Sequence, residues 1–315
     1  MPLEFAPQRD VSATQEDAYP TRHPDRETWL ERKDPVVWTD KMPPAPLTRS
    51  DMDSFERDGF LVMRDLFSPA EVAALVDRSR ELREGGRAVA GDDVVTEPDS
   101  DAVRTIFRLD EHDGLMNALS RDARIAGIVS HLLADDVYLH QSRLNYKPGF
   151  TGKEFYWHSD FETWHAEDGM PRMRAISASL LLTENRAQNG ALMLMPGSQN
   201  VFVSCQGETP DANHESSLKR QEVGTPSQVS LADLAAQHGI TDAEGPAGTL
   251  ILFDCNTIHG SNGNITPTPR SNAFFVYNAV SNALTEPFAA SGARPDFLAT
   301  RNTPEPIDIR GGALV

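Results

Sequence analysis

Glu154-Phe-Tyr-Trp-His-Ser-Asp160 lies in the part of the sequence, residues 137–278, where hydrophobic residues recur with a period close to two. This period predicts β-strands, and we predict one over residues 154–160. Side chains two residues apart in a strand point to the same face of a sheet. His158 and Asp160 are therefore expected to present an imidazole and a carboxylate side by side.

The order of the predicted elements indicates the fold class. Capping and turn signals predict helices over residues 50–58, 68–84 and 121–133, and strands over 60–66 and 105–109. Further strands are predicted over 137–146, 175–183, 191–195, 249–254 and 272–278. Helices followed by many short strands predict an α+β, mainly β fold, with a double-stranded β-helix (jelly-roll, cupin-like) core and flanking helices.

A second histidine, His259, follows the predicted strand over residues 249–254. In a jelly roll, strands that are distant in sequence meet at the mouth of the barrel, where His259 would join His158 and Asp160. Two histidines and one carboxylate form the facial triad of non-haem Fe(II) oxygenases, which leaves coordination positions open. The pattern predicts an iron site, although a lone His-x-Asp motif would be a weak signal.

Arg270 precedes the predicted strand over residues 272–278, so its guanidinium is expected to enter the barrel beside the metal. A guanidinium binds a carboxylate through two parallel hydrogen bonds. We therefore predict that Arg270 holds the distal carboxylate of 2-oxoglutarate, with O2 as the other co-substrate. The alternative for Arg270 alone is an ordinary surface charge.

The composition limits the class of protein. The chain has 315 residues, 47 acidic and 29 basic, with a formal net charge of −18. This acidic balance argues against nucleic-acid binding. The two cysteines do not require a disulfide framework, and there is no apolar run of membrane-spanning or signal-peptide length. We expect a cytoplasmic protein without membrane partners; a homodimer is left open.

The predicted organisation is a proline-rich N-terminal arm over residues 1–47 and a single domain over residues 48–315. The arm is expected to be extended on the surface or partly disordered. A polar insertion near residues 205–245 interrupts the strands and is the expected lid. Residues 86–101, rich in Gly and Asp, are expected to form a mobile loop.

The stretch Phe155-Tyr-Trp-His-Ser-Asp-Phe-Glu-Thr-Trp-His-Ala-Glu-Asp-Gly-Met-Pro-Arg-Met-Arg174 closely resembles the diagnostic stretch of ectoine hydroxylases. The layout from Leu47 to Tyr277 resembles the phytanoyl-CoA dioxygenase superfamily, to which they belong. The resemblance implies a jelly-roll fold and O2-dependent conversion of ectoine to 5-hydroxyectoine.

The resemblance also implies roles for individual residues. Implied iron ligands are His158, Asp160 and His259. Implied 2-oxoglutarate positions are Lys147, Arg270, Asn145, Ser261 and Phe155. Implied substrate contacts are Gln141, Trp164, Thr163, Phe253 and Phe274. Independently of the resemblance, an indole such as Trp164 can stack on a cationic ring, and the amide of Gln141 can hydrogen-bond it without adding charge. His165 is interpreted as a surface or supporting residue and not as a ligand.

Two alternatives remain at the level of sequence. The same iron chemistry could act on a free amino acid, an acyl-CoA or a specialised metabolite. A non-catalytic jelly-roll binding protein would be a different class, and an intact triad together with Arg270 argues against it.

Overall fold

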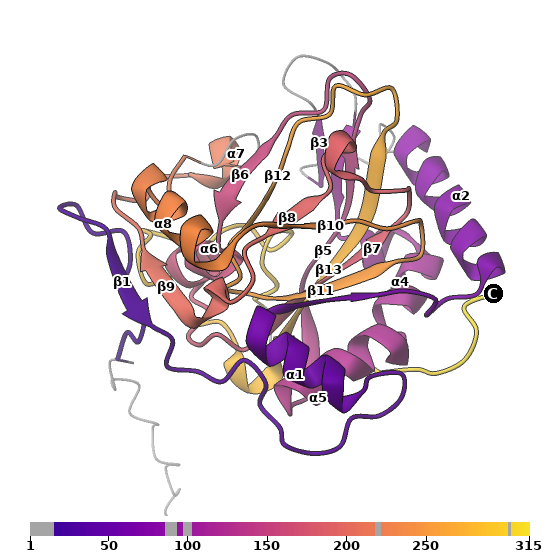
Figure 1. The fold of residues 1–315 in the computed structure, drawn as a ribbon, viewed down its shortest axis with the longest axis horizontal. Coiled ribbons are helices and arrows are strands. Elements are labelled where there is room, and N and C mark those ends of the chain that lie inside the picture. The colour runs from indigo at the N-terminus through magenta and orange to yellow at the C-terminus, as the bar shows by residue number, and fades with distance from the viewer. Residues whose placement is uncertain (1–15, 86–92, 97–102, 218–221, 302–303) are drawn as a thin grey trace, which may run out of the picture.

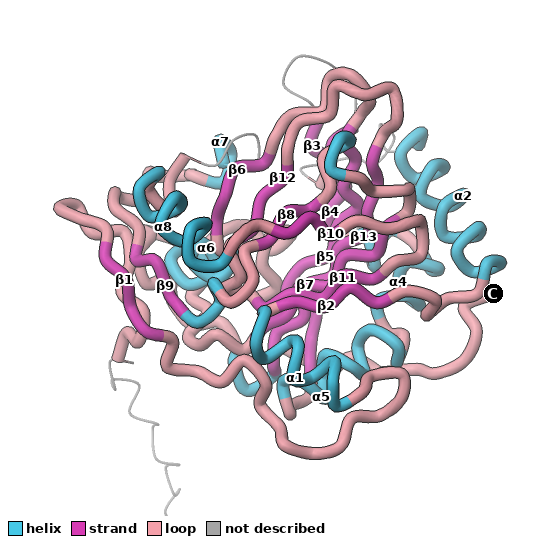
Figure 2. Tube along the Cα trace, viewed as in Figure 1, coloured by secondary structure: helices cyan, strands magenta, loops and turns pink. Residues whose placement is uncertain are grey.

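A computed structural model describes residues 16–85, 93–96, 103–217, 222–301 and 304–315 of the chain. Two antiparallel sheets form its centre (Figures 1 and 2). The seven-stranded sheet has the order β2 (Phe60–Met63), β11 (Leu250–Asp254), β7 (Ala175–Leu181), β13 (Arg270–Ala279), β5 (Val137–Lys147), β4 (Val103–Phe107) and β3 (Val94–Thr96). The four-stranded sheet has the order β10 (Thr241–Ala243), β8 (Leu192–Leu194), β12 (His259–Ser261) and β6 (Phe155–His158). A separate ribbon pairs β1 (Thr28–Glu31) with β9 (Val201–Ser204).

Helices cover one face of the seven-stranded sheet, as Figure 1 shows for α2 and α4 on one side and for α1 and α5 below. The longer of them are α1 (Arg49–Asp58), α2 (Pro69–Gly85), α4 (Gly114–Ser120) and α5 (Ile128–Leu133). Helix α8 (Gln228–His238) lies elsewhere in the chain, between β9 and β10. The short helical segments are α3 (Leu109–His112), α6 (Asp160–Thr163), α7 (His214–Ser217), the π-helical turns η2 (Ala123–Gly127) and η3 (Trp164–Asp168), and the 3₁₀ turns η4 (Ala187–Asn189), η5 (Ser198–Asn200) and η6 (Val280–Asn282).

The alternation of side chains along β13 separates two cores. Phe275 belongs to the cluster that packs the sheet against the helices, together with Phe55 of α1 and Leu75 of α2. Its neighbour Phe274 points to the other face and packs with Leu194 in the cluster between the two sheets. Burial of both faces explains the continuous run of apolar and aromatic residues in the middle of β13, Ala273–Tyr277, and the arrangement confirms the predicted jelly-roll class.

Local signals predicted the first helices accurately. Thr48 and Asp51 form a capping box at the start of α1, and Gly59 ends the helix with a φ of 79°. At α2 the Ser68 amide donates to Glu71 over 2.7 Å, and the Glu71 amide donates to the Ser68 hydroxyl over 3.3 Å. These boundaries depend on neighbouring residues only, which is why the sequence indicates them.

Several predicted boundaries are wrong. The strand predicted over 154–160 ends at His158, and Asp160 begins helix α6 after the extended Ser159, because Phe161 donates its amide to the Cys255 carbonyl. The predicted strand over 105–109 is β4, and Leu109 already begins α3. The predicted helix over 121–133 is divided into η2 and α5, since Asp122 caps a separate π-helical turn.

The described part of the N-terminal arm is tied into the domain more firmly than its proline content indicates. Tyr19 is fully buried, and its hydroxyl donates to Asp34 over 2.8 Å. Strand β1 pairs in register with β9. The loop expected over 86–101 falls mostly outside the described residues; within it the structure describes β3. Among the described residues, no helix is long and apolar enough to cross a membrane.

Candidate active site

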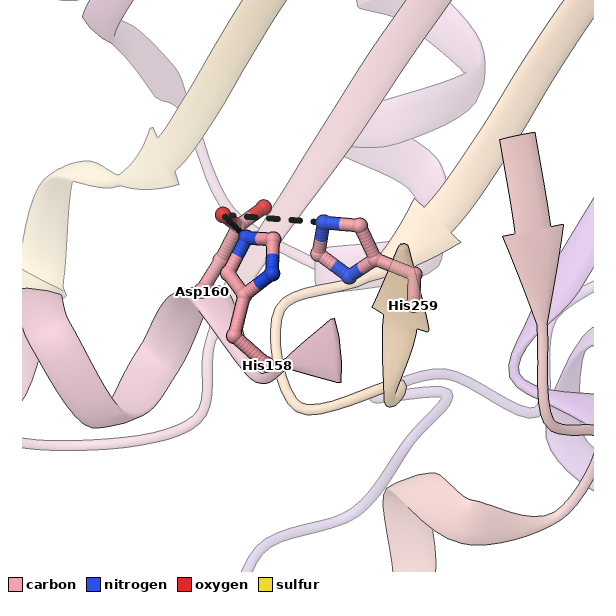
Figure 3. Close-up of side chains that lie close together, drawn as sticks. All are labelled: His158, Asp160 and His259. Carbon is pink, nitrogen blue, oxygen red and sulfur yellow. Dashed lines mark ion pairs between the residues drawn. The ribbon is translucent and has the colours of Figure 1, made fainter. Parts of the chain in front are cut away.

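Two neighbouring strands bring the triad together. Strands β6 and β12 are antiparallel, and His158 lies directly opposite His259 in their register. Asp160 Oδ1 is 3.5 Å from His158 Nε2 and 3.9 Å from His259 Nε2, and all three residues are buried (Figure 3). Within the described ranges this is the one group of His, Cys, Asp or Glu side chains close enough to hold a metal ion.

Backbone carbonyls orient both imidazoles. Nδ1 of His158 lies 2.8 Å from the Tyr156 carbonyl, and Nδ1 of His259 lies 2.9 Å from the Thr257 carbonyl. A carbonyl only accepts, so each Nδ1 donates its proton to a carbonyl and each Nε2 is left facing Asp160, where it could bind a metal ion. Burial, followed by the neighbouring His158, lowers the pKa of His259 to about 4, which leaves this ring neutral near pH 7.

The carboxylate completes a donor set that suits a divalent cation. Burial alone would raise the pKa of Asp160, but the two imidazoles and Arg143 hold this pKa below its ordinary value. The Ser177 hydroxyl donates to Asp160 Oδ2 over 3.2 Å and orients the carboxylate. One ligand atom from each of the three residues lies within 4.8 Å of the other two, so a single cation between them could contact all three. The triad therefore fits Fe(II) and leaves further coordination positions open.

One face of β5 supplies most of the cavity beside the triad. Alternate side chains of this strand line the cavity: Gln141, Arg143, Asn145 and Lys147. Strand β13 pairs with β5, and it adds Arg270 and Phe274 to the same cavity. The period of two along β5 is the reason that four polar residues converge on one space.

Arg270 and Lys147 form an unusual cross-strand pair. They lie directly opposite each other in the register of β13 and β5, and both are buried. Like charges in this position repel each other. Lys147 donates to the Ser261 hydroxyl over 2.9 Å and to the Asn262 carbonyl, while Arg270 donates to the Gly190 carbonyl. Burial lowers the pKa of Arg270 to about 10, with no described carboxylate to offset the desolvation. This pair is suited to bind an anion.

Gly190 provides space for these cations. Its φ is 83°, and a Cβ atom there would lie 2.5 Å from the Asn262 carbonyl oxygen and 3.0 Å from Lys147 Nζ. A larger residue would displace the lysine, so the turn requires glycine.

Helix α6 and the turn η3 also contribute to the cavity wall. Thr163 and Trp164 line the cavity, and the Trp164 ring contacts the buried His140 edge-on, with 5.1 Å between centroids. Phe155 also lines the cavity and contacts His158, with 4.8 Å between ring centroids. Phe253 differs from the other proposed substrate contacts, because it packs behind His259 in the core between the sheets and is absent from the cavity lining.

The cavity is strongly basic although the chain carries a net charge of −18. Its basic lining residues are Arg104, Arg143, Lys147, Lys153, Arg270 and Arg294. Its acidic lining residues are Asp160 and Glu167. Such a local excess of positive charge favours anionic ligands.

Sequence reasoning missed three of these arginines: Arg104, Arg143 and Arg294. Arg143 donates to the Gln141 side-chain carbonyl, and its guanidinium carbon lies 4.9 Å from the Phe274 ring centroid. Arg143 lies halfway between Gln141 and Asn145 on one face of the same strand, and this spacing could have identified it as a cavity residue. Arg294 comes from the C-terminal segment and forms two hydrogen bonds of 2.7 and 2.6 Å with the buried Asp168. No periodicity in the sequence marks this contact.

His165 is buried outside the triad. Its Nδ1 is 2.8 Å from the Met170 carbonyl, its Nε2 is 2.9 Å from Asp17, and its ring stacks on Phe288 with 4.0 Å between centroids. These contacts show that His165 is a buried residue that supports the structure near the site, and they exclude the interpretation of His165 as a surface residue.

Comparison with known proteins agrees with this geometry. The family model for phytanoyl-CoA dioxygenase (PhyH) matches residues 55–272. The ectoine dioxygenase of Stutzerimonas stutzeri is 51% identical over 296 residues, which covers 94% of this chain and 98% of the relative. That of Sphingopyxis alaskensis is 52% identical over 300 residues, covering 95% and 98% of the two chains.

Solved structures show the same likeness. The crystal structure of EctD from S. alaskensis with 2-oxoglutarate and 5-hydroxyectoine has a TM-score of 0.88 at 48% identity, covering 95% of this chain and 100% of that one. The structure of EctD with bound Fe has a TM-score of 0.87 at 48% identity and the same coverage. From the triad, the fold and these similarities, we conclude that the chain belongs to the phytanoyl-CoA dioxygenase family, in the group that contains the ectoine dioxygenases.

Proposed function

We propose that this protein hydroxylates ectoine to 5-hydroxyectoine, consuming one 2-oxoglutarate and one O2 and releasing succinate and CO2. One oxygen atom enters the alcohol and the other enters succinate, so atoms and electrons balance. The observation that supports the proposal most is the position of the His158, Asp160 and His259 triad in the same cavity as the buried cations Arg270 and Lys147. The chain is about half identical in sequence to ectoine dioxygenases, which supports the choice of ectoine as substrate.

In this proposal the three triad residues hold Fe(II), which supplies the activation of O2 that is coupled to decarboxylation of the co-substrate. Arg270 binds the distal carboxylate of 2-oxoglutarate, and Lys147 contributes a second positive charge beside it. Ser261 orients the lysine through the 2.9 Å hydrogen bond. Asn145 and Phe155 also line the cavity, and in this proposal they supply a polar and an apolar contact to the co-substrate.

Ectoine is a small zwitterion with a delocalised amidinium ring and a carboxylate, and the cavity offers a complement to each. Trp164 can stack on the cationic ring, and Phe274 and Thr163 enclose it. Arg143 is a cation for the carboxylate, and Gln141 is held beside it. These side chains would contribute to the rate by holding one C–H bond of ectoine next to the metal, because orientation of the reacting groups supplies much of the catalytic effect. We assign Phe253 an indirect role through the His259 ring.

The proposal is tested by incubating purified protein with Fe(II), 2-oxoglutarate, O2 and ectoine, and by measuring the products with mass spectrometry. We expect one hydroxyectoine per succinate. Proline and other small zwitterions serve as control substrates. Equal or faster turnover of a control would assign the same iron chemistry to another substrate, and absence of turnover of every substrate would favour a binding protein.

Trp164→Ala is expected to weaken ectoine use more than 2-oxoglutarate use. Loss of a desolvated cation–aromatic contact costs about 2 kcal/mol, which corresponds to a roughly 30-fold higher ectoine KM. The KM for 2-oxoglutarate should change less than about twofold, because Arg270 binds it from the β13 side of the cavity. Trp29→Ala is the matched control, since Trp29 is 37% exposed and is not among the residues that line the cavity. Equal effects on both KM values would contradict the assignment.

The cytoplasmic location and the homodimer remain predictions from the sequence. Gel filtration with light scattering measures the oligomeric state directly.

A further inference from the structure

Arg22 of the N-terminal arm is buried against the segment that carries the substrate wall. Its Nε and Nη2 donate to the two carboxylate oxygens of Glu162 over 3.1 and 3.0 Å. Its Nη1 donates to Glu167 over 2.7 Å. The three side chains are 1–3% exposed. Thr21 adds a hydrogen bond of 2.8 Å from its hydroxyl to Glu162.

The buried charges of Arg22, Glu162 and Glu167 stabilise one another. Burial alone would lower the pKa of Arg22, but Glu162 and Glu167 raise this pKa above its ordinary value. Two buried carboxylates share this guanidinium, so its removal would leave them without their main counter-charge. Arg22 has a φ of 61°, in the left-handed region that favours glycine, so a bulky charged residue is held in a strained backbone to make this contact.

The segment that Arg22 holds is α6 followed by η3, residues 160–168. It contains the triad residue Asp160 at one end and the cavity residues Thr163 and Trp164 in its middle. Its last part is a π-helical turn, a geometry that is frequent at functional sites and that needs support from tertiary contacts. On the far side the C-terminal Arg294 binds Asp168. Arg22 of the N-terminal arm and Arg294, which are distant along the chain, therefore both hold this short segment as a clamp.

The insertion also reaches this clamp. Asn213 donates to Glu167 over 2.8 Å, and Arg22 Nη1 donates to Thr209 over 2.8 Å. A Cβ atom on Gly224 would lie 2.1 Å from Glu162 Oε2 and 2.8 Å from Arg22 Nη2. Residues of the insertion thus pack directly on the buried ion pair, and this packing requires glycine at position 224.

We propose that Arg22 is a positioning residue that sets the place of Trp164 and Thr163 at the substrate site through its ion pairs with Glu162 and Glu167. The proposal rests on the proposed function for its effect on ectoine, but the position of the indole can be measured without substrate. A displacement of about 1 Å in such a wall can change turnover by about 100-fold.

The first measurement is the ¹⁹F spectrum of the protein labelled with 5-fluorotryptophan. The chain has four tryptophans, and Trp164→Phe assigns the resonance of interest. We expect Arg22→Ala to shift or broaden the Trp164 resonance, Arg22→Lys to restore part of the wild-type position, and the control Arg26→Ala to leave it unchanged. Arg26 is an exposed arginine four residues further along the arm.

Gly224→Ala tests the clamp without removing a charge, in case Arg22→Ala does not fold. Gly224 has a φ of 74°, and its added Cβ would press on Glu162 and Arg22. Gly239→Ala is the matched control, because Gly239 has a φ of 73° and nothing within 4 Å of an added Cβ. Both positions have a positive φ, but only Gly224 has atoms of the ion pair beside an added Cβ, so a shift of the Trp164 resonance in Gly224→Ala alone points to the contact with the ion pair.

The second measurement is calorimetric binding of ectoine to the anaerobic Fe(II) protein with 2-oxoglutarate. Arg22→Ala and Gly224→Ala are expected to raise the ectoine Kd at least about tenfold, with iron content and 2-oxoglutarate Kd within about twofold of wild type. If the wild type does not bind ectoine, the proposed function fails, and the ¹⁹F spectra still decide the positioning role. An unchanged Trp164 resonance in folded variants that only melt at a lower temperature would overturn it.

Discussion

Replacing Asp160 with alanine is expected to lower the affinity for Fe(II) by more than about 100-fold and to abolish turnover. Loss of a group that merely orients a ligand costs about 10–100-fold in metal affinity, and Asp160 is placed to bind the metal itself. It is the acidic member of the triad, and its Oδ1 lies 3.5 and 3.9 Å from the two Nε2 atoms. Without its negative charge, two neutral imidazoles would remain to hold a dication. His158→Ala and His259→Ala should have effects of the same order.

The measurement is iron stoichiometry by metal analysis, together with circular dichroism to establish that each variant is folded. His23→Ala is a suitable control, because His23 is an exposed histidine outside the triad. His165→Ala should lower thermal stability through its lost contacts with Met170 and Asp17 while iron binding persists. A folded Asp160→Ala protein with wild-type iron content would exclude the proposed metal site.

Arg270→Ala is expected to raise the KM for 2-oxoglutarate by about 30- to 5,000-fold, which corresponds to the roughly 2–5 kcal/mol lost when one partner of a buried charged hydrogen bond is removed. Arg270 is buried opposite Lys147, and with a pKa of about 10 it remains protonated near pH 7. Arg270→Lys keeps a charge but loses the two-pronged geometry, so an intermediate KM is expected.

Steady-state kinetics with ectoine saturating and 2-oxoglutarate varied measures this effect. Lys147→Ala should raise the same KM by a smaller factor, because the lysine already donates to Ser261 and Asn262. Arg80→Ala, a change on the exposed side of α2, serves as the control. If the 2-oxoglutarate KM stays at the wild-type value in both Arg270 variants, the co-substrate must bind elsewhere.

Local interactions explain which parts of the fold the sequence determined. The capping residues Thr48 and Ser68 and the terminating Gly59 act within a few residues, so they place α1 and α2 without reference to the rest of the chain. The long strands β5 and β13 extend over enough residues for their hydrophobic pattern to be recognised. The sequence did not predict the short strands β9 and β12, which are defined by their pairing with strands that are distant along the chain.

The same distinction holds at the site. The chemistry of His158, Asp160, His259 and Arg270 pointed to iron and a dicarboxylate, because those residue types suit few other tasks in this combination. Which other side chains join them depends on contacts between residues that are distant along the chain. Arg22 and Glu162 are separated by 140 positions and meet only in the folded state. A buried charge is costly without its partner, so each member of this pair depends on the other. No spacing in the sequence indicates that the two residues meet. How the substrate wall is held was therefore decided by the tertiary structure alone.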